Sequence, residues 1–413
     1  MTQYQALKIM LSGDSVFLTG PPGSGKTFLL KQFISQSKRK KLNVAITATT
    51  GIAATYLDGT TIHSWAGIGL NDDLGPKEKK RLLANTRLAN RYITTDILVI
   101  DEVSMLDRAR LDLINELAKM FRGNDKPMGG IQLILVGDLF QLPPVSDLTD
   151  PYIFKSKAWA ELDLKVCYLS DQYRQLEGDE LNTILASIRS NRVGQIELSL
   201  LKSKLDQRQP IRTILKLYSH NFDADQINQY NLGLLKGRQK LYKMRTKGSK
   251  KNVDDLKRSI ISPIELYLKT GSEVIFTANN YSLGYVNGDR ARVVGFKAGY
   301  PIVRMNRSAY LTVKEHHFRR EVDSLTIAEA WQLPLKLAWA ITIHKSQGMS
   351  LEEAQIDLSR AFSAGMGYVA LSRLRTINGL YLLGFNKMSL YVNPEIVKFD
   401  KILRDLSDKL VLR

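Results

Sequence analysis

A loop near the start of the chain has the residue types and spacing needed to hold a nucleoside triphosphate. Residues 20–27 are Gly-Pro-Pro-Gly-Ser-Gly-Lys-Thr, which fits the pattern G-x-x-x-x-G-K-[ST] of a phosphate-binding loop. Its glycines let backbone N–H groups turn toward a phosphate, Lys26 would reach the β- and γ-phosphates, and the Thr27 hydroxyl would ligate Mg²⁺. The residues expected to bind nucleotide in this loop are Gly20, Gly23, Ser24, Gly25, Lys26 and Thr27.

A pair of acidic residues supplies the complementary chemistry. Asp101 and Glu102 directly follow the apolar run 97–100, so the expected buried strand ends in two carboxylates at the edge where ligands bind in open α/β sheets. Asp101 would hold Mg²⁺, directly or through water, and Glu102 would act as general base toward the attacking water. The loop and the acidic pair together indicate an enzyme that hydrolyses a nucleoside triphosphate with Mg²⁺, without indicating what the energy is used for.

Three further polar residues could sense or contact the terminal phosphate. Gln141 lies in Gly137-Asp-Leu-Phe-Gln-Leu-Pro-Pro144, where the prolines would stiffen the loop, although the same residues could form no more than a rigid turn. Arg174 and Arg373 lie far downstream, and an isolated arginine is commonly a solvated surface residue. If a second domain supplied both as cationic fingers to a phosphate held by the first, hydrolysis would depend on domain closure.

The elements expected around these residues alternate between strand and helix. Short apolar strands at 16–19, 43–48, 97–100 and 131–136, with a helix at 27–37, predict a doubly wound α/β core with a buried parallel sheet. Residues 171–284 and 332–413 indicate a second α/β region. Two segments depart from this pattern: a basic helical insertion within 67–91, flanked by turn residues such as Asp72, and a β-rich insertion at 285–331 that contains the hairpin-type turn Asn287-Gly288.

The charge balance restricts the partners. Lys and Arg number 59 against 41 Asp and Glu, a formal net charge of +18 over 413 residues, which favours nucleic acid first and an anionic membrane surface second. Residues 236–251 form the basic segment that best suits single-stranded DNA, because Tyr242 adds an aromatic platform. The cluster at 38–41 is more typical of a solvated helix end.

The sequence lacks membrane, secretory and disulfide signals, which limits the class of protein further. No run of 18 apolar residues or secretory pattern occurs, and Cys167 is the only cysteine, so we expect a soluble, non-secreted cytoplasmic protein, bacterial or phage-encoded, without a membrane partner. His316 and His317 are adjacent and should point to opposite sides of a strand, which disfavours a metal pair.

Several ordered segments resemble the PIF-one family of superfamily 1 DNA helicases, on the branch that includes RecD-type enzymes. They cover nearly the whole chain, from Gln3 to about Leu383. In addition to the loop, the acidic pair and the Gln141 segment, the matching segments are 49–54, 61–69, 113–118 with 124–133, 169–175, 343–348 and 368–373. Met366 departs from the family, which frequently has Gln at this position. We also expect a minimal motor core without the appended tails of larger relatives.

The resemblance implies an ATP-dependent 5′-to-3′ helicase that translocates on single-stranded DNA and unwinds duplex or structured DNA, in replication, repair or recombination. Its partners would be single-stranded DNA and duplex junctions, with a monomer acting on DNA. The fold implied is α/β, with two RecA-like P-loop domains, a small 1B wedge and a β-rich SH3-like 2B insertion. The boundaries are 1–66 and 92–170 for 1A, 67–91 for 1B, 171–284 and 332–413 for 2A, and 285–331 for 2B.

The resemblance also carries residue roles over. Gln3 matches a glutamine that recognises adenine, and Gly348 is expected to contact the nucleotide. The catalytic set is Lys26, Glu102, Gln141, Arg174 and Arg373. The positions expected to contact the DNA strand are Thr50, His63, Pro143, His344 and Lys345.

Alternatives from other classes remain at this point. A P-loop ATPase of an assembly or clamp-loading machine would share the loop and the acidic pair, but would not need Gln141 or the segment around Gly348. A nonenzymatic nucleic-acid-binding protein with a decayed ATP site would not need Lys26, Glu102 and Arg373 intact. A DNA-stimulated ATPase or translocase that does not separate strands would retain every one of these residues.

Overall fold

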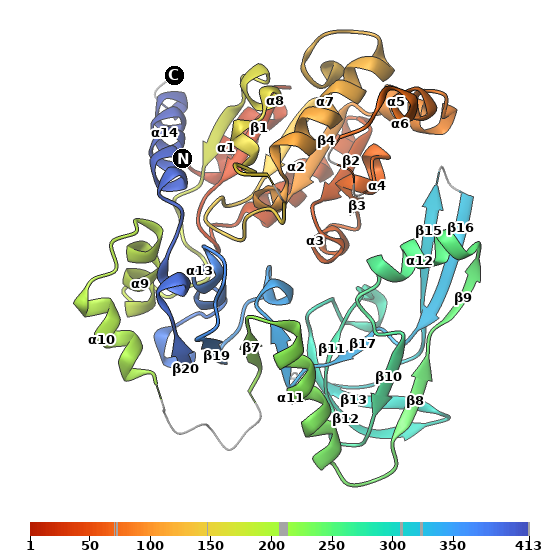
Figure 1. The fold of residues 1–413 in the computed structure, drawn as a ribbon, viewed down its shortest axis with the longest axis vertical. Helices are drawn as coiled ribbons and strands as arrows, with labels where there is room; N and C mark the ends of the chain where they lie inside the picture. The colour runs from red at the N-terminus through yellow and green to blue at the C-terminus, as the bar shows by residue number, and fades with distance from the viewer. Residues whose placement is uncertain are drawn as a thin grey trace. The chain divides into compact units, whose positions relative to one another are not determined.

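The computed structural model describes residues 1–69, 71, 73–146, 148–205, 214–305, 309–322 and 325–411, so the expected turn residue Asp72 lies outside the described residues (Figure 1). Internal contacts divide the chain into two units. The first comprises residues 1–207, 350–353 and 358–413, and the second comprises 208–349 and 354–357. Among the described residues, no helix combines the length and apolar character needed to cross a bilayer.

The first unit contains the loop and the acidic pair. Its helices and strands are α1 (Gln3–Leu11), β1 (Val16–Thr19), α2 (Lys26–Arg39), β2 (Val44–Ala48), α3 (Gly51–Tyr56), β3 (Thr60–Thr61), α4 (Ile62–Ala66), α5 (Pro76–Leu83), α6 (Thr86–Thr94), β4 (Ile97–Asp101), α7 (Arg108–Arg122), β5 (Gln132–Val136), α8 (Lys157–Glu161), β6 (Lys165–Tyr168), α9 (Glu180–Arg189), α10 (Gln195–Ser203), α13 (Met366–Leu371), β20 (Leu380–Phe385) and α14 (Pro394–Val411).

A parallel sheet organises this unit. Within the described residues its strand order is β3-β2-β4-β5-β1-β6, and every neighbouring pair is parallel. Each residue of β1 and of β4 is buried, as expected for strands covered on both faces. The predicted strands agree with β1, β2, β4 and β5 to within one residue at either end, whereas β6 was not predicted. Because the strands are parallel, the loop after β1 and the acidic pair after β4 emerge at the same sheet edge.

The basic insertion consists of two helices where a single helical stretch was expected. Asn85 separates α5 from α6, because its side-chain oxygen accepts hydrogen bonds from the backbone N–H groups of Arg87 and Leu88, both at 3.1 Å. The end of α6 is fastened to α4, since Arg91 donates to the carbonyl oxygen of Trp65 at 2.7 Å. The insertion is therefore built onto the helix that carries His63.

The second unit is mainly antiparallel. Its helices and strands are β7 (Lys216–Tyr218), α11 (Asn221–Leu234), β8 (Lys240–Lys243), β9 (Arg245–Gly248), α12 (Lys250–Ser259), β10 (Glu265–Leu268), β11 (Glu273–Phe276), β12 (Arg290–Lys297), β13 (Tyr300–Met305), β14 (Tyr310–Thr312), β15 (His316–Val322), β16 (Leu325–Gln332), β17 (Leu335–Leu337), β18 (Ala340–Thr342) and most of β19 (Ala354–Leu358).

Antiparallel pairing in this unit is not confined to residues 285–331. The described strands form sheets in the orders β14-β13-β12-β11-β17, β15-β16-β9 and β10-β8, while β7 lies in parallel between β18 and β19. The adjacent histidines of β15 point apart, as expected. His317 stacks on Trp331 and lies 2.9 Å from a carboxylate oxygen of Glu329, whereas His316 meets the ring of Phe318.

Candidate active site

The phosphate-binding loop lies between β1 and α2, in the context that the motif requires. Gly23 has a φ of +91°, and a Cβ added there would lie 2.6 Å from the Cβ of Arg174, so only glycine fits. Among the described side chains, the hydroxyl oxygen of Ser24 is buried without a hydrogen-bond partner. A loop that turns its backbone inward and holds an unpaired hydroxyl fits a bound phosphate.

Lys26 points into this loop. Its ammonium donates hydrogen bonds to the carbonyl oxygens of Gly20 at 2.7 Å and Pro21 at 2.9 Å. Burial lowers the pKa of Lys26 to about 8, while the charges of Asp138 and Glu102 oppose that shift. A cation desolvated to this degree gains free energy from a nearby polyanion, which suits contact with phosphate oxygens.

The acidic pair stands at the end of β4. Asp101 is buried, and one of its carboxylate oxygens accepts a hydrogen bond from the backbone N–H of Glu102 at 2.8 Å. Burial, followed by the charge of Glu102, raises the pKa of Asp101. Glu102 has a φ of 52°, a left-handed conformation that is costly for a residue with a side chain and that occurs frequently at functional positions.

The two arginines predicted to be phosphate fingers meet at Ser372. Arg174 donates to the Ser372 carbonyl oxygen at 3.0 Å, and Arg373 donates to the Ser372 hydroxyl at 2.9 Å. Burial lowers the pKa of both guanidinium groups, that of Arg373 to about 9, and the charge of Glu102 opposes the shift in each. Segments almost 200 residues apart in the chain therefore bring two desolvated cations toward the same carboxylate.

Two other residues of the predicted nucleotide site, Gln3 and Gln141, also lie in the first unit. Gln3, near the start of α1, donates from its amide nitrogen to the carbonyl oxygen of Ser24 at 3.5 Å, so it touches the phosphate-binding loop. Gln141 is buried in the loop after β5, and its backbone N–H donates to the carbonyl oxygen of Asp138 at 3.0 Å. Gly348 belongs to the second unit, where it follows a 3₁₀ turn at His344–Ser346.

The residues expected near DNA are distributed over both units. In the first unit, Thr50 precedes α3 and its hydroxyl accepts from the Ala53 N–H at 3.2 Å, His63 lies on α4, and Pro143 follows Gln141. In the second unit, Lys345 donates to the side-chain oxygen of Asn221 at 2.9 Å.

The two expected DNA-contacting histidines have similar electrostatic surroundings. Burial lowers the pKa of His63, and the charge of Arg110 lowers it further. The pKa of His344 is likewise lowered by burial and by Lys345. In both cases the surroundings favour the neutral imidazole.

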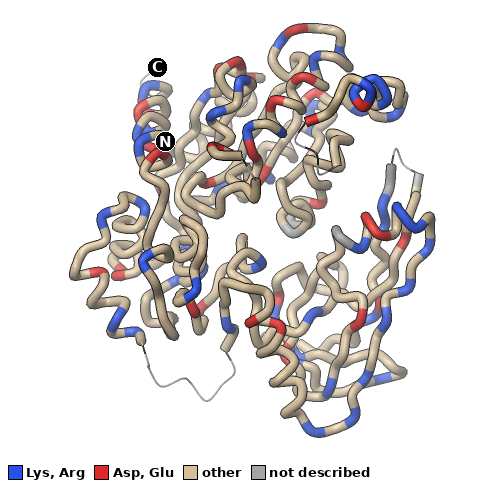
Figure 2. Tube along the Cα trace, viewed as in Figure 1, with Lys and Arg blue, Asp and Glu red and all other residues tan. Residues whose placement is uncertain are grey.

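The basic segment 236–251 carries less uncompensated charge than its sequence indicates. Figure 2 shows Lys and Arg along β8 and β9, but carboxylates from other segments of the second unit accompany three of them. The nitrogen-to-oxygen distances are 3.2 Å for Lys243 with Glu265, 2.5 Å for Arg245 with Glu315 and 3.7 Å for Lys247 with Glu329. Tyr242, the expected stacking platform, donates its hydroxyl to the carbonyl oxygen of Gly299 at 2.6 Å.

The donor atoms present also fit Mg²⁺. Thr27 offers a hydroxyl on the first turn of α2, and Asp101 offers a carboxylate at the end of β4; oxygen donors of this kind suit a small, hard cation that keeps several waters. In the described part of the chain, no cluster of three or more His, Cys, Asp or Glu side chains is arranged around a common point.

One buried residue near the site, Arg189, belongs to none of the motifs recognised in the sequence. Arg189 ends α9 with 8% of its surface exposed and contacts Asp138, in the same loop as Gln141. In sequence it is a single arginine after an amphipathic helix, a pattern shared by many surface residues. No signal in the sequence separates it from those.

Comparison with known proteins extends the likeness to the whole chain. Residues 4–198 match the family model described as PIF1-like helicase. The ATP-dependent DNA helicase Pif1 of Psychrobacter sp. is 38% identical over 98% of this chain and 71% of its own length. The crystal structure of Pif1 helicase from Candida albicans has a TM-score of 0.85 at 30% identity, covering 97% of this chain and 98% of the other.

A third relative was solved with both a nucleotide analogue and DNA. The Pif1 helicase from Bacteroides in complex with ADP-AlF3 and single-stranded DNA has a TM-score of 0.72 at 28% identity, with 98% of both chains covered. These likenesses confirm the predicted fold class of two RecA-like P-loop domains with a small 1B insertion and a β-rich, SH3-like 2B insertion. The chain belongs to the PIF1-like helicase family.

Proposed function

We propose that this chain is a motor that moves 5′ to 3′ along single-stranded DNA and separates duplex or structured DNA ahead of it. ATP-dependent DNA helicase activity accords with its family, and the direction of movement is our proposal. One observation supports the ATP-driven motor. Lys26, Glu102, Arg174 and Arg373 come from distant segments and gather within one unit around one phosphate-binding loop.

In the proposed nucleotide site, each residue has a distinct role. Lys26 and the backbone N–H groups of its loop hold the β- and γ-phosphates of ATP, and Gln3 contacts the adenine. Glu102 accepts a proton from the attacking water, and Gln141 senses the γ-phosphate. Thr27 and Asp101 would hold Mg²⁺, which neutralises charge on the phosphate oxygens when bound.

The arginines convert nucleotide state into movement. Arg174 and Arg373 are drawn to the charge of the γ-phosphate, and that attraction is lost when phosphate leaves. If two domains grip DNA alternately, each cycle advances the strand. We place these domains at the boundaries expected from the sequence, with both arginines in 2A, the phosphate-binding loop in 1A, the 2B insertion at 285–331, and Gly348 contacting the nucleotide.

The DNA strand is held by neutral and cationic side chains in this proposal. Thr50, His63 and Pro143 contact it from 1A, and His344 and Lys345 contact it from 2A. The insertion 67–91 meets the duplex junction as a wedge. One copy of the chain suffices for movement, and its work lies in replication, repair or recombination in the cytoplasm.

Two measurements on the wild-type chain test the proposal. ATP turnover is measured with and without single-stranded DNA, and unwinding is measured on duplexes with a 5′ or a 3′ single-stranded tail. We expect DNA to stimulate turnover and only the 5′-tailed duplex to be separated. Unwinding of the 3′-tailed duplex alone would refute the direction, and stimulated turnover without separation of either duplex would favour a translocase.

A further inference from the structure

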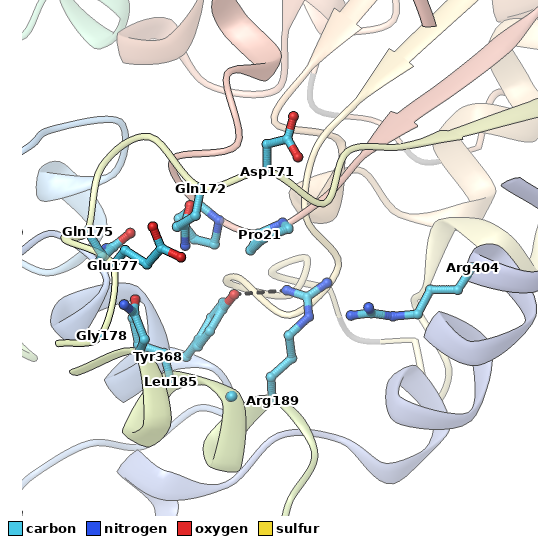
Figure 3. Close-up of a pocket in the computed structure, with 13 residues that line it drawn as sticks. Pro21, Asp171, Gln172, Gln175, Glu177, Gly178, Leu185, Arg189, Tyr368 and Arg404 are labelled. Carbon is cyan, nitrogen blue, oxygen red and sulfur yellow. Dashed lines mark hydrogen bonds between the residues drawn. The ribbon is translucent and has the colours of Figure 1, made fainter. Parts of the chain in front are cut away.

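A buried arginine connects the Gln141 loop to the helix that precedes Arg373. The Arg189 guanidinium donates to both carboxylate oxygens of Asp138, at 2.8 and 2.9 Å, and to the hydroxyl of Tyr368 at 2.8 Å. Figure 3 shows Arg189 and Tyr368 pointing toward each other across a pocket. The Tyr368 hydroxyl in turn donates to Asp138 at 3.2 Å, so each side chain of this triad is hydrogen-bonded to the other two.

On one side, this triad fixes the loop that carries Gln141. A carboxylate oxygen of Asp138 accepts from the backbone N–H of Phe140 at 3.2 Å, and the Asp138 carbonyl accepts from that of Gln141 at 3.0 Å. The Arg189 guanidinium also lies over the Phe140 ring, 3.9 Å from its centroid. Charge-assisted hydrogen bonds in a buried setting hold such a loop in one conformation.

On the other side, the triad fixes α13. Tyr368 lies on this short helix, and Arg373 follows its end, where its Nε donates to the carbonyl oxygen of Val369 at 2.9 Å. A displacement of Tyr368 is therefore passed to Arg373 through a single rigid turn of backbone.

A backbone contact links the same two elements independently. Gly365, the residue before α13, has a φ of +79°, and a Cβ there would lie 2.5 Å from the carbonyl oxygen of Phe140 and 2.8 Å from that of Gln141. The loop and the helix thus touch where only glycine fits. A pocket of about 590 Å³ lies beside the triad, bounded by Pro21 and Pro22 of the phosphate-binding loop among other residues, and leaves room for these side chains to rearrange (Figure 3).

We propose that Arg189 is a positioning residue that makes Gln141 and Arg373 move as one, through its triad with Asp138 and Tyr368. The inference rests on the motor function proposed above and adds the element by which phosphate sensing and the arginine finger are coupled. Arg189 touches neither substrate nor reacting atoms in this account, and acts through the loop and α13.

Two tyrosines provide a matched pair of variants. Tyr168 also accepts a hydrogen bond from Arg189, at 2.9 Å, but it lies on β6 and its hydroxyl donates to Asp400 of α14 at 3.0 Å. Tyr368→Phe and Tyr168→Phe each remove one hydroxyl from the same guanidinium and retain the ring. A role limited to stability would lower the thermal unfolding temperature in both variants without separating their kinetics.

We expect Tyr368→Phe to lower the DNA-stimulated kcat for ATP by roughly tenfold, with the KM for ATP changed by less than about twofold. Tyr168→Phe should leave both constants at the wild-type values. If DNA stimulates the wild-type chain normally, two results would overturn the inference: an unchanged kcat in Tyr368→Phe, or equal losses of kcat in the two variants. A wild-type chain that DNA does not stimulate would refute the motor function itself.

A double-mutant cycle keeps the test decisive if one variant is poorly folded. Arg189→Gln, Tyr368→Phe and the double variant are compared, with circular dichroism establishing which of them fold. If the triad acts as a unit, the second substitution adds little to the loss in kcat. Independent, multiplicative losses would overturn the coupling, and Asp138→Asn can replace a variant that does not fold.

Discussion

Lys26 and Arg373 in the first unit are desolvated cations, whereas Lys243 and Lys247 in the second unit lie at the surface beside carboxylates. Burial lowers the pKa of Lys26 to about 8 and that of Arg373 to about 9. The two surface lysines instead lie 3.2 Å from Glu265 and 3.7 Å from Glu329, with 67% and 77% of their side chains exposed.

The difference indicates where a polyanion is bound strongly. A desolvated cation has given up its hydration before a ligand arrives, so it gains more free energy from an arriving phosphate than a solvated cation does. A surface cation that has a carboxylate neighbour and water must exchange one partner for another, and its net gain is small. Positive charge in the sequence is therefore a weaker guide to binding than the burial of that charge.

Removing the lysine of the phosphate-binding loop is expected to have the largest effect. Lys26→Ala should abolish ATP turnover, a loss of several orders of magnitude, because no other side chain replaces the ammonium at the phosphates. Phosphate release measures the effect. Lys31→Ala, on the exposed face of the same helix, is the matched control. Turnover near the wild-type level in Lys26→Ala would end the assignment of the nucleotide site.

Arg373→Ala should lose DNA-stimulated hydrolysis by roughly 10³-fold and retain ATP binding, since an arginine finger acts mainly on the transition state. Turnover with saturating single-stranded DNA and binding of a fluorescent ATP analogue separate the two effects. Arg375→Ala, two residues further on and exposed, should behave as the wild-type chain. Full stimulation in Arg373→Ala would show that this residue is not a finger.

A smaller effect is expected at the insertion. Replacing Lys77, Lys80 and Arg81 of α5 by serine should slow unwinding several-fold and spare ATP turnover, because these cations would contact phosphates at the duplex junction. Deleting 71–91 would be less informative, since Arg91 holds the Trp65 carbonyl of α4. Serine at Lys38, Lys40 and Lys41 controls for total charge. An unaffected rate of strand separation would contradict the wedge.

The smallest effect is expected for two lysines of the second unit, Lys345 and Lys247, which differ in whether an amide or a carboxylate accompanies the cation. Lys345→Ala should weaken single-stranded DNA binding and reduce the slope of log affinity against log salt by about 0.7, the value for one phosphate contact. Lys247→Ala should change neither, because Glu329 already accompanies this cation. Fluorescence anisotropy at several salt concentrations measures both. The comparison fails if Lys247→Ala reduces the slope as much as Lys345→Ala does.

The sequence predicted the elements around the phosphate-binding loop well, because short apolar strands and a glycine-rich turn are locally encoded. It predicted less about the insertion, where Asn85 divides one expected helical stretch into two. It overestimated the free charge of segment 236–251, because the compensating residue Glu315 lies 70 positions from Arg245. Hydrophobic and turn patterns within one element could be predicted from the sequence, whereas ion pairs between distant elements could not.

The sequence by itself determined the nucleotide chemistry of this protein, since Lys26 with Thr27 and Asp101 with Glu102 each form a recognisable pair shortly after an apolar strand, and parallel strands place both pairs at one sheet edge. Only the tertiary structure decided that Arg174 and Arg373 meet at Ser372, and that Arg189 is buried against Asp138. The physical reason is burial: an arginine has the same charge at the surface as in the interior, and folding alone decides whether it loses its water.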